Sequence, residues 1–291
     1  MPVPPVVPAE LRSRVFRGTA VVGAGLLTRA QLRSSPWRRV LPDVYVHEDV
    51  AVTHALRARA AAGVLLPDAV VTGCSAAVLW GVDLAGPADD VELTRAPGTN
   101  PVRVPGLRVR RAVLPPGAVG RRRGVAVTTP EATAAAVAAA LPGDDGVVAV
   151  DRLVHSGVVD LDAVRRCAAS LTGPGSRRAR DVCALADGLA ESPQETRVRL
   201  LVRRSPLPDP VAQFRVYDGA RFVARVDFGW PDRRVALEYD GLWHADPGQL
   251  GRDRARLNRL TAAGWRVVFG TAADLHHGHR LLARVAVALG G

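Results

Sequence analysis

Apolar and polar residues alternate along residues 221–244 and predict two short strands joined by a tight turn at Pro231 and Asp232. Successive side chains point to opposite faces of a strand, so the apolar face of the first strand carries Phe222, Ala224, Val226 and Phe228. Asp227 then lies on the opposite face. In the second strand, Glu238 and Asp240 share the face opposite the apolar residues Val235, Leu237 and Tyr239. Each strand therefore offers one side for packing and carboxylates on the other.

These three carboxylates would repel one another on neighbouring strands unless a cation lies between them. Hard divalent cations prefer carboxylate oxygens as ligands. The spacing therefore predicts a metal site formed by Asp227 and Glu238, with Asp240 close to it. An acidic sheet face exposed to solvent is the alternative that the same pattern allows.

The hydrophobic pattern of residues 192–291 predicts the element order α-β-β-β-α-β-α. Ser192 is expected to cap the first helix, with Glu195 three residues later in the position of a capping box. Glu195 could therefore cap the helix, join the carboxylates of the strands, or do both. The remaining elements are a strand at 213–217, the two strands described above, a helix at 249–263, a strand at 265–269 and a helix at 280–289.

The first 50 residues predict a helix-turn-helix with a wing, which follows a proline-rich arm at 1–10. Thr28 is expected to cap the first helix and Ser35 the second, with Pro36 at its first position. A strand at 44–47 would follow. Arg38 and Arg39 would then lie on the second helix, where contacts with bases or phosphates are made. A small helical subdomain with surface arginines is the alternative.

Residues 51–190 predict a mixed α+β and helical region. Helices are expected at 54–63 and 75–81, and strands at 90–95, 102–104 and 107–113. Pro130 is expected to open an alanine-rich helix, and further helices are expected at 145–157, 160–171 and 180–189. The sequence thus predicts an α/β protein in which this region separates the N-terminal segment from a C-terminal domain at 191–291.

The charge of the chain indicates a polyanionic partner. The 291 residues carry a formal net charge of +11, which makes double-stranded DNA the first candidate. All 39 basic residues are arginine, and the three cysteines are too far apart to form a zinc motif. Because the sequence also lacks a signal-peptide core and an apolar run of membrane-spanning length, we expect a cytoplasmic protein without a membrane partner. A homodimer stays open.

Three segments of the first half carry a family resemblance: TRAQLRSSPWRRVLPDVYV, VVTGCSAAVLWG and VAVTTPEATAAAVAAAL. Over roughly residues 10–185 they resemble the winged-helix and helical region of AbiEi-type proteins, which are antitoxin-like and regulator-like modules. The resemblance implies DNA contact or a scaffolding role, and it assigns no particular site residue.

The C-terminal domain carries four motifs in order, within SPQETRVRLLVRR, RVDFGWPDRRVALEYDGLWH and RDRARLNRLTAAGWRVVFGTAADL. Over residues 192–275 they resemble the Vsr-like endonucleases, related to very-short-patch repair, of the PD-(D/E)XK nuclease superfamily. The resemblance implies hydrolysis of DNA phosphodiester bonds with Mg²⁺ or Mn²⁺, in repair, restriction or phage defence. By position, Asp227 and Glu238 resemble the two metal carboxylates, and Glu195 resembles the acid of the first helix.

One position departs from the family pattern, since Asp240 stands where the PD-(D/E)XK motif has lysine. The candidates to replace that cation or to bind DNA are arginines on the two helices, namely Arg197, Arg252, Arg256 and Arg259. His244 matches a histidine of the Vsr-like relatives and could be a general acid or base, or a surface residue at a strand end. The missing lysine supports an alternative function, a non-catalytic DNA-binding regulator or AbiEi-like antitoxin with a degenerate nuclease fold.

Overall fold

The computed structural model describes residues 7–34, 36–240 and 247–290, and the chain forms two compact units. The first unit consists of the residues up to 140 together with 158–180. The second unit consists of 141–157 together with the residues from 181 onward. The sequence predicted a C-terminal domain that begins at 191, but helix α5 (Gly143–His155) belongs to the second unit as well. Buried hydrogen bonds explain this, because Asp151 of α5 accepts from Thr196 Oγ1 at 2.8 Å and from Arg199 Nη2 at 2.7 Å.

The N-terminal segment folds around a three-stranded sheet with the order β1-β3-β2. Its elements are the 3-10 turn η1 (Ala9–Leu11), β1 (Phe16–Arg17), α1 (Gly18–Gly23), the 3-10 turn η2 (Gln31–Arg33), β2 (Trp37–Leu41) and β3 (Val44–His47). The strand expected at 44–47 is confirmed. The helix expected after Thr28 is only the turn η2, where Thr28 and Gln31 exchange two hydrogen bonds of 2.7 and 3.1 Å.

The second helix predicted for this segment, with Ser35 as its cap, is wrong, because residues 37–41 form strand β2. Ser35 itself lies outside the described residues. Asp43, with a φ of 61°, lies in the tight turn that brings β2 beside β3. Trp37 then packs edge-on against Phe16, with ring centroids 5.1 Å apart. Strand pairing and the burial of Trp37 outweigh the local helix signal.

Arg38 and Arg39 therefore lie exposed on β2, opposite Val46 and Tyr45 of β3. The prediction that they lie on a recognition helix is wrong. They belong instead to the hairpin that follows the short helical elements.

The rest of the first unit contains a five-stranded sheet with the order β6-β5-β4-β8-β7. Its strands are β4 (Val70–Val71), β5 (Val91–Arg95), β6 (Leu107–Arg111), β7 (Val119–Arg122) and β8 (Val125–Thr128). The helices are α2 (His54–Ala60), which continues as the π-turn η3 (Ala61–Leu65), α3 (Gly73–Trp80), α4 (Pro130–Ala140) and α6 (Leu161–Ser170). Helix α7 (Ser176–Leu185) runs from the first unit into the second.

Several predictions for this region need correction. The described structure has no strand at 102–104, and β7 and β8 were not predicted. Helix α3 begins at Gly73 and not at Ser75. Ser75 is used inside the helix, because its Oγ accepts a hydrogen bond from Glu92 N at 2.9 Å and bonds His54 Nε2 at 2.7 Å. A serine that fixes a tertiary contact thus resembled a helix cap in the sequence.

The second unit is built on a four-stranded sheet with the order β12-β11-β10-β9. From α8 onward, its helices and strands follow the predicted order α-β-β-β-α-β-α, which is confirmed. The short turn η4 and helix α10 are additions to that order. The elements are α8 (Pro193–Arg203), β9 (Val211–Asp218), β10 (Arg221–Trp230), η4 (Pro231–Arg233), β11 (Val235–Tyr239), α9 (Pro247–Ala262), β12 (Arg266–Gly270), α10 (Ala272–His276) and α11 (Gly278–Gly290). Strands β9, β10 and β11 pair antiparallel, and β12 is parallel to β11.

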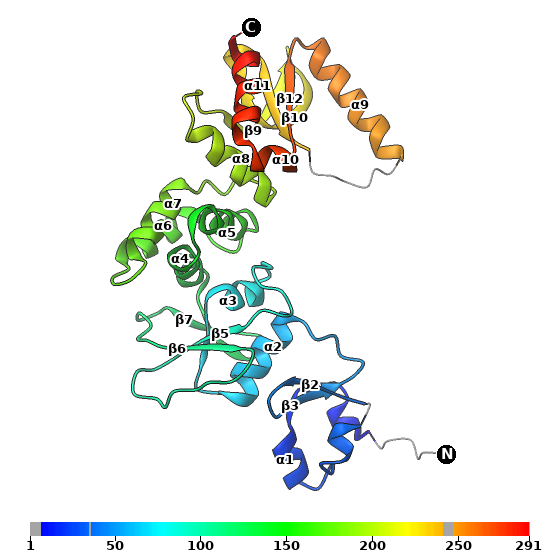
Figure 1. Cartoon of the computed structure of the whole chain (residues 1–291), viewed down its shortest axis with the longest axis vertical. Helices are drawn as coiled ribbons and strands as arrows, with labels where there is room; N and C mark the ends of the chain where they lie inside the picture. The colour runs from blue at the N-terminus through cyan, green and yellow to red at the C-terminus, as the bar shows by residue number, and fades with distance from the viewer. Residues whose placement is uncertain (1–6, 35, 241–246, 291) are drawn as a thin grey trace. The chain divides into compact units, whose positions relative to one another are not determined.

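Helices cover both faces of this sheet, with α11 and α9 on opposite sides (Figure 1). Val235 and Leu237 of β11 pack into a hydrophobic cluster with α8 and α11. Ala236 between them packs into a second cluster, with Leu260 of α9 and Trp265. This division follows from the alternation of side chains along a strand. The protein is therefore an α/β protein whose C-terminal sheet is enclosed between helices.

The predicted apolar face of β10 is only partly right. A β-bulge lies between Phe222 and Ala224, so that Phe222 is 53% exposed while Val223 is buried. Further along, Val226 packs in the cluster with α9, and Phe228 packs in the cluster with α8 and α11. Val226 and Phe228, which alternation places on one face, therefore pack in different clusters.

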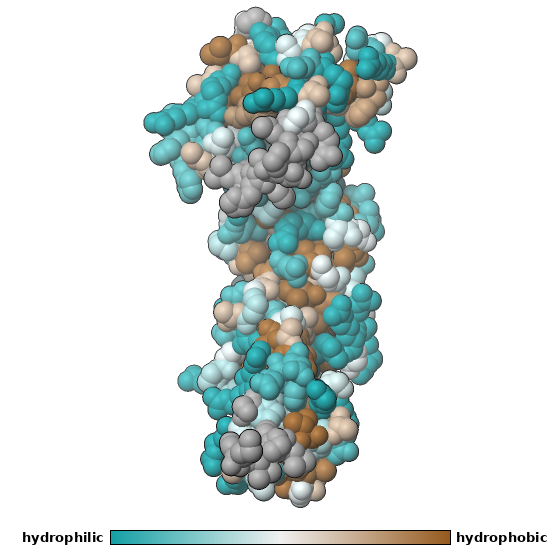
Figure 2. Space-filling model, turned by 90° about the vertical axis from the view of Figure 1, so that its right-hand side faces the viewer, coloured by the Kyte–Doolittle hydropathy of each residue, from teal (hydrophilic) through white to brown (hydrophobic). Residues whose placement is uncertain are grey.

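The surface is hydrophilic with smaller hydrophobic patches on the face drawn in Figure 2. Among the described residues, no helix combines the length and the apolar composition that a bilayer span requires. The cysteines are free thiols, of which Cys183 is buried and Cys74 and Cys167 are half-buried.

Candidate functional site

Helix α8 brings the first candidate carboxylate to the sheet. Ser192 caps the helix as predicted, since its Oγ accepts from Glu195 N at 3.2 Å. The carboxylate of Glu195 does not close the capping box on Ser192. Its Oε2 accepts instead from Glu191 N at 2.9 Å and from Gln213 Nε2 of β9 at 3.0 Å. Glu195 is buried. Its bond to Glu191 N stabilises the start of α8, and its bond to Gln213 links the helix to strand β9.

Asp227 lies in the middle of the candidate site. Its Oδ2 accepts a hydrogen bond from Tyr239 N of β11 at 2.8 Å. The pKa of Asp227 is raised to about 6, chiefly by burial and also by the negative charges of Glu195 and Glu238, against the opposing effects of the Tyr239 N–H and Arg256. A carboxyl group whose pKa lies this near neutrality exchanges protons in the physiological range.

Glu238 on β11 is held by an arginine of helix α9. Its residue is 7% exposed, and Arg256 Nη1 donates to Oε2 at 2.7 Å while Nη2 donates to Oε1 at 2.6 Å. Arg256 Nη2 also donates to the backbone oxygen of Arg225 at 3.0 Å. Both carboxylate oxygens of Glu238 are therefore bound to one guanidinium group, in the bidentate geometry that arginine and carboxylate favour.

The structure thus brings Glu195, Asp227, Glu238 and Arg256 together. The other predicted residues that it describes have different surroundings. Asp240 is exposed just beyond β11, where its backbone N–H donates to Gly270 O at 2.7 Å. Arg259 is exposed on α9, and Arg197 pairs with Asp145 of α5 at 2.8 Å. His244 and the side chain of Arg252 lie outside the described residues.

The carboxylates suit a hard cation in their chemistry but not in their present arrangement. In the described parts of the chain, no group of three or more His, Cys, Asp or Glu side chains is placed to hold a metal ion. The physical reason lies at Glu238, whose two oxygens already bind Arg256. A divalent ion beside Glu238 would also meet the positive guanidinium. The site as described therefore does not fit Mg²⁺ or Mn²⁺.

Three further residues shape the site and escaped the sequence analysis. Gln213 binds Glu195 from a backbone with φ of 50°, which is uncommon outside glycine. Glu191 supplies its N–H to Glu195 and pairs through its carboxylate with Arg225 at 2.6 Å. The only local signal for these residues was the position of Glu191 just before the helix cap, because the contact with Gln213 depends on how α8 packs against β9.

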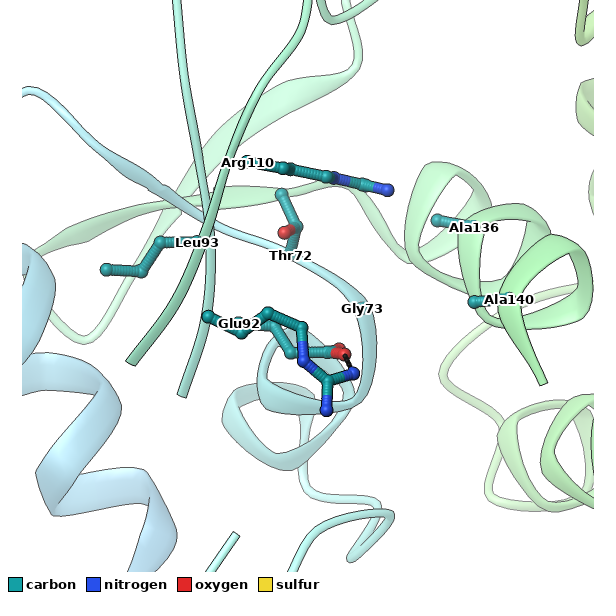
Figure 3. Close-up of a pocket in the computed structure, with 8 residues that line it drawn as sticks. Thr72, Gly73, Glu92, Leu93, Arg110, Ala136 and Ala140 are labelled. Atoms are coloured by element: carbon teal, nitrogen blue, oxygen red, sulfur yellow. Dashed lines mark hydrogen bonds and ion pairs between the residues drawn. The ribbon is translucent and has the colours of Figure 1, made fainter. Parts of the chain in front are cut away.

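A second cluster of charged residues lines a pocket of about 160 Å³ in the first unit (Figure 3). Glu92 Oε2 accepts from Cys74 N at 2.7 Å at the start of α3, and Glu92 Oε1 pairs with Arg108 at 3.3 Å. Arg110 extends across the pocket toward α4 in Figure 3, and its Nε donates to Thr94 Oγ1 at 2.9 Å. Glu92 thus joins the start of α3 to the sheet, and Thr94 holds Arg110 at the pocket.

Comparisons with known proteins place the chain among uncharacterized relatives. No family model matches it. It is similar to "Uncharacterized protein MT2308" and "Uncharacterized protein Rv2248" from two strains of Mycobacterium tuberculosis, each 34% identical over 191 residues, which are 62% of this chain and 70% of the relative. Among solved structures, the RV2827C protein from Mycobacterium tuberculosis covers 70% of this chain and 84% of its own, at 15% identity and a TM-score of 0.40, a likeness too slight to support an argument. The identity and coverage of the first two relatives show that this chain belongs to the same protein family as they do.

Proposed function

We propose that the second unit hydrolyses phosphodiester bonds in double-stranded DNA, as a Vsr-like member of the PD-(D/E)XK superfamily. The observation that supports this is the convergence of three acidic residues from three elements. Glu195 of α8 and Glu238 of β11 both lie near enough to Asp227 of β10 to raise its pKa. The element order from α8 to α11 agrees with the order that the resemblance implies.

Burial of the three carboxyl groups at one place favours a functional role. Glu195 and Glu238 are buried and Asp227 is half-buried. Charged groups are costly to bury, and a carboxyl group with a strongly raised pKa, as in Asp227, is more typical of a functional site than of an ordinary core. The hydrogen bonds of Glu195 and Glu238 offset part of that cost. Asp227 has one backbone donor and two negative neighbours, and its ionised form is disfavoured, so its pKa is raised.

Asp227 and Arg256 have defined roles in this proposal. Asp227, with a pKa of about 6, can take up or release a proton near neutral pH. Arg256 of α9 supplies positive charge beside the carboxylates, in place of the lysine of the superfamily pattern, which is missing at position 240. A phosphate oxygen is a good partner for its guanidinium group. The resemblance implies Mg²⁺ or Mn²⁺ on Asp227, Glu238 and Glu195, and the present binding of Glu238 by Arg256 stands against such an ion.

A second function, a DNA-binding regulator without catalysis, is favoured by that same ion pair. If the contact between Arg256 and Glu238 persists when DNA binds, the acidic cluster is a structural feature of a decayed nuclease fold. Exposed arginines such as Arg38 and Arg39 of β2 then provide phosphate contacts. The AbiEi-like resemblance of the first half agrees with this function or with an antitoxin-like role.

A cleavage assay separates the two functions. The full-length protein is incubated with supercoiled plasmid and with single-stranded DNA in Mg²⁺ or Mn²⁺, beside Asp227→Asn, Glu238→Gln and the control Asp218→Asn, which changes an exposed acid at the end of β9. The nuclease proposal expects cutting by the wild type and the control, and loss of cutting with retained DNA binding in the other two variants. Binding without cutting by any protein would favour the regulator.

A further inference from the structure

In the ion pair between Arg256 and Glu238, the guanidinium group occupies the carboxylate that a metal ion would need. The guanidinium group stays charged at any physiological pH. It makes three hydrogen bonds at the sheet, two to the Glu238 carboxylate and one to the oxygen of Arg225. These contacts place one fixed positive charge at the carboxylate that the superfamily pattern assigns to a metal.

The two partners differ in their access to solvent. The side chain of Glu238 is 10% exposed, whereas that of Arg256 is 33% exposed. Arg256 can therefore meet a second anion from solvent without leaving the site, while both oxygens of the less exposed Glu238 already accept hydrogen bonds from Arg256. The third bond of Arg256 is to a neutral carbonyl oxygen, which a phosphate oxygen can replace with a stronger, charge-assisted bond.

We infer that Arg256 keeps divalent metal off Glu238 in the free protein. When a backbone phosphate of nucleic acid binds the guanidinium group instead, Arg256 releases the Glu238 carboxylate. The exclusion of metal follows from the contacts of this chain alone. The release by phosphate rests on the proposed function. In this scheme Arg256 is a positioning residue that couples metal binding to substrate binding, and the disagreement between the described site and its implied metal is a property of the resting protein.

Binding of Mn²⁺ to the full-length protein, followed by the electron paramagnetic resonance signal of free Mn²⁺, tests the exclusion without any cleavage. Arg256→Met removes the positive charge and keeps most of the side-chain volume. Arg254→Met is the matched control, because Arg254 is exposed on the same helix and carries the same charge. We expect Arg256→Met to bind one Mn²⁺ at least about 10-fold more tightly than wild type, equivalent to about 1.4 kcal/mol. Arg254→Met should match the wild type, and adding Asp227→Asn to Arg256→Met should abolish the gain.

A short DNA duplex tests the release. With wild type, the mixture of protein and duplex should bind more Mn²⁺ than the protein alone and the duplex alone bind together. With Arg256→Met, the mixture should bind little more than that sum. A folded Arg256→Met protein with unchanged Mn²⁺ affinity would overturn the exclusion. Should that variant fail to fold, Arg256→Lys serves, since lysine keeps the charge but cannot bind both oxygens. An intermediate gain supports the inference and no gain contradicts it. A gain in Mn²⁺ affinity without DNA cleavage by any variant would retain the exclusion and reject the nuclease function.

Discussion

Asp227 accepts a hydrogen bond from the backbone N–H of Tyr239, 2.8 Å away on the neighbouring strand. This bond lies next to the last regular pair of β10 and β11, in which Phe228 is opposite Leu237. A side chain thus continues the contact between two strands where the backbone ladder ends. The bond favours the ionised carboxylate, yet burial and two acidic neighbours raise the pKa of Asp227 to about 6. The site therefore holds its central acid in a form that costs stability at neutral pH.

The first prediction concerns this pH dependence. An unfolded aspartate has a pKa of about 3.9. Because the pKa of Asp227 is raised to about 6 in the folded protein, the folded state gains stability as pH falls from about 6 to about 4, and this gain is lost as pH rises through 6. Asp227→Asn removes the titrating group and should stabilise the protein by about 1–3 kcal/mol at pH 7.5 and by less than about 1 kcal/mol at pH 4.5.

Urea unfolding of the full-length proteins at both pH values, followed by tryptophan fluorescence, measures this difference. Asp218→Asn at the exposed end of β9 is the control and should show no such pH dependence. Equal effects of Asp227→Asn at the two pH values would show that Asp227 titrates normally.

The second prediction concerns the buried pair of Asp151 and Arg199, which joins α5 to α8. Asp151 Oδ1 accepts from Asp187 N and Gly188 N, both at 2.9 Å, and its Oδ2 accepts from Arg199 Nη2 at 2.7 Å. Asp151→Ala removes one of the two carboxylates that pair with the buried Arg199, the other being Asp187 at 3.0 Å, and it also leaves two backbone N–H groups and the Thr196 hydroxyl without their acceptor. We therefore expect the free energy of unfolding to fall by about 3–5 kcal/mol. Urea denaturation checks this value.

The control for that variant lies on the same helix. Asp145 pairs with Arg197 at 2.8 Å, but its side chain is 58% exposed. Asp145→Ala should therefore cost less than about 1 kcal/mol. A similar loss in the two variants would mean that burial does not govern the strength of these pairs.

The third prediction concerns the approach of Glu92 to Gly73. Gly73 has a φ of 58°, and a Cβ atom there would lie 1.9 Å from Glu92 Oε2. Gly73→Ala would strain the backbone and push Glu92 from the N–H of Cys74, which it accepts at 2.7 Å. We expect a loss of about 1–3 kcal/mol in thermal or chemical unfolding.

Gly23→Ala is the matched control in the same unit. Among the described residues beyond its own helical turn, no atom lies within 4 Å of the position of its Cβ, and the residue is helical. This change should be neutral or stabilise by about 0.5–1 kcal/mol. A neutral Gly73→Ala variant would show that Glu92 and the α3 start adjust freely.

The fourth prediction concerns the salt dependence of DNA binding. Each phosphate contact on duplex DNA contributes about −0.9 to the slope of log affinity against log salt. If Arg38 and Arg39 contact phosphates from their exposed positions on β2, replacing both with alanine should make the slope shallower by about 1.8. Fluorescence anisotropy at several salt concentrations measures it.

Arg12 is the control, since it is exposed in the same segment but lies 3.5 Å from Asp49. Arg12→Ala should leave the slope near that of wild type. A wild-type slope close to zero would contradict both nucleic-acid functions, and a steep slope unchanged by the double variant would move the interface away from β2.

The elements of the second unit could be predicted because their signals are local. Ser192 caps α8 through a bond to the residue three positions later, and Val235, Leu237 and Ala236 divide between two clusters by simple alternation. The same local rules failed at Ser35 and Ser75, where a serine stood beside a possible helix start. At the first, pairing with β3 overrode the signal, and at the second the hydroxyl group was needed for a tertiary contact.

The sequence by itself determined the α/β class, the order of elements in the C-terminal sheet and the presence of Glu195, Asp227 and Glu238 on one helix and two strands. Only the tertiary structure decided what surrounds these acids. Caps and alternation act between residues a few positions apart, so they can be read along the chain. The pairing of Arg256 with Glu238, like that of Arg199 with Asp151, joins residues 18 and 48 positions apart, and it exists only because packed helices bring their guanidinium groups to buried carboxylates.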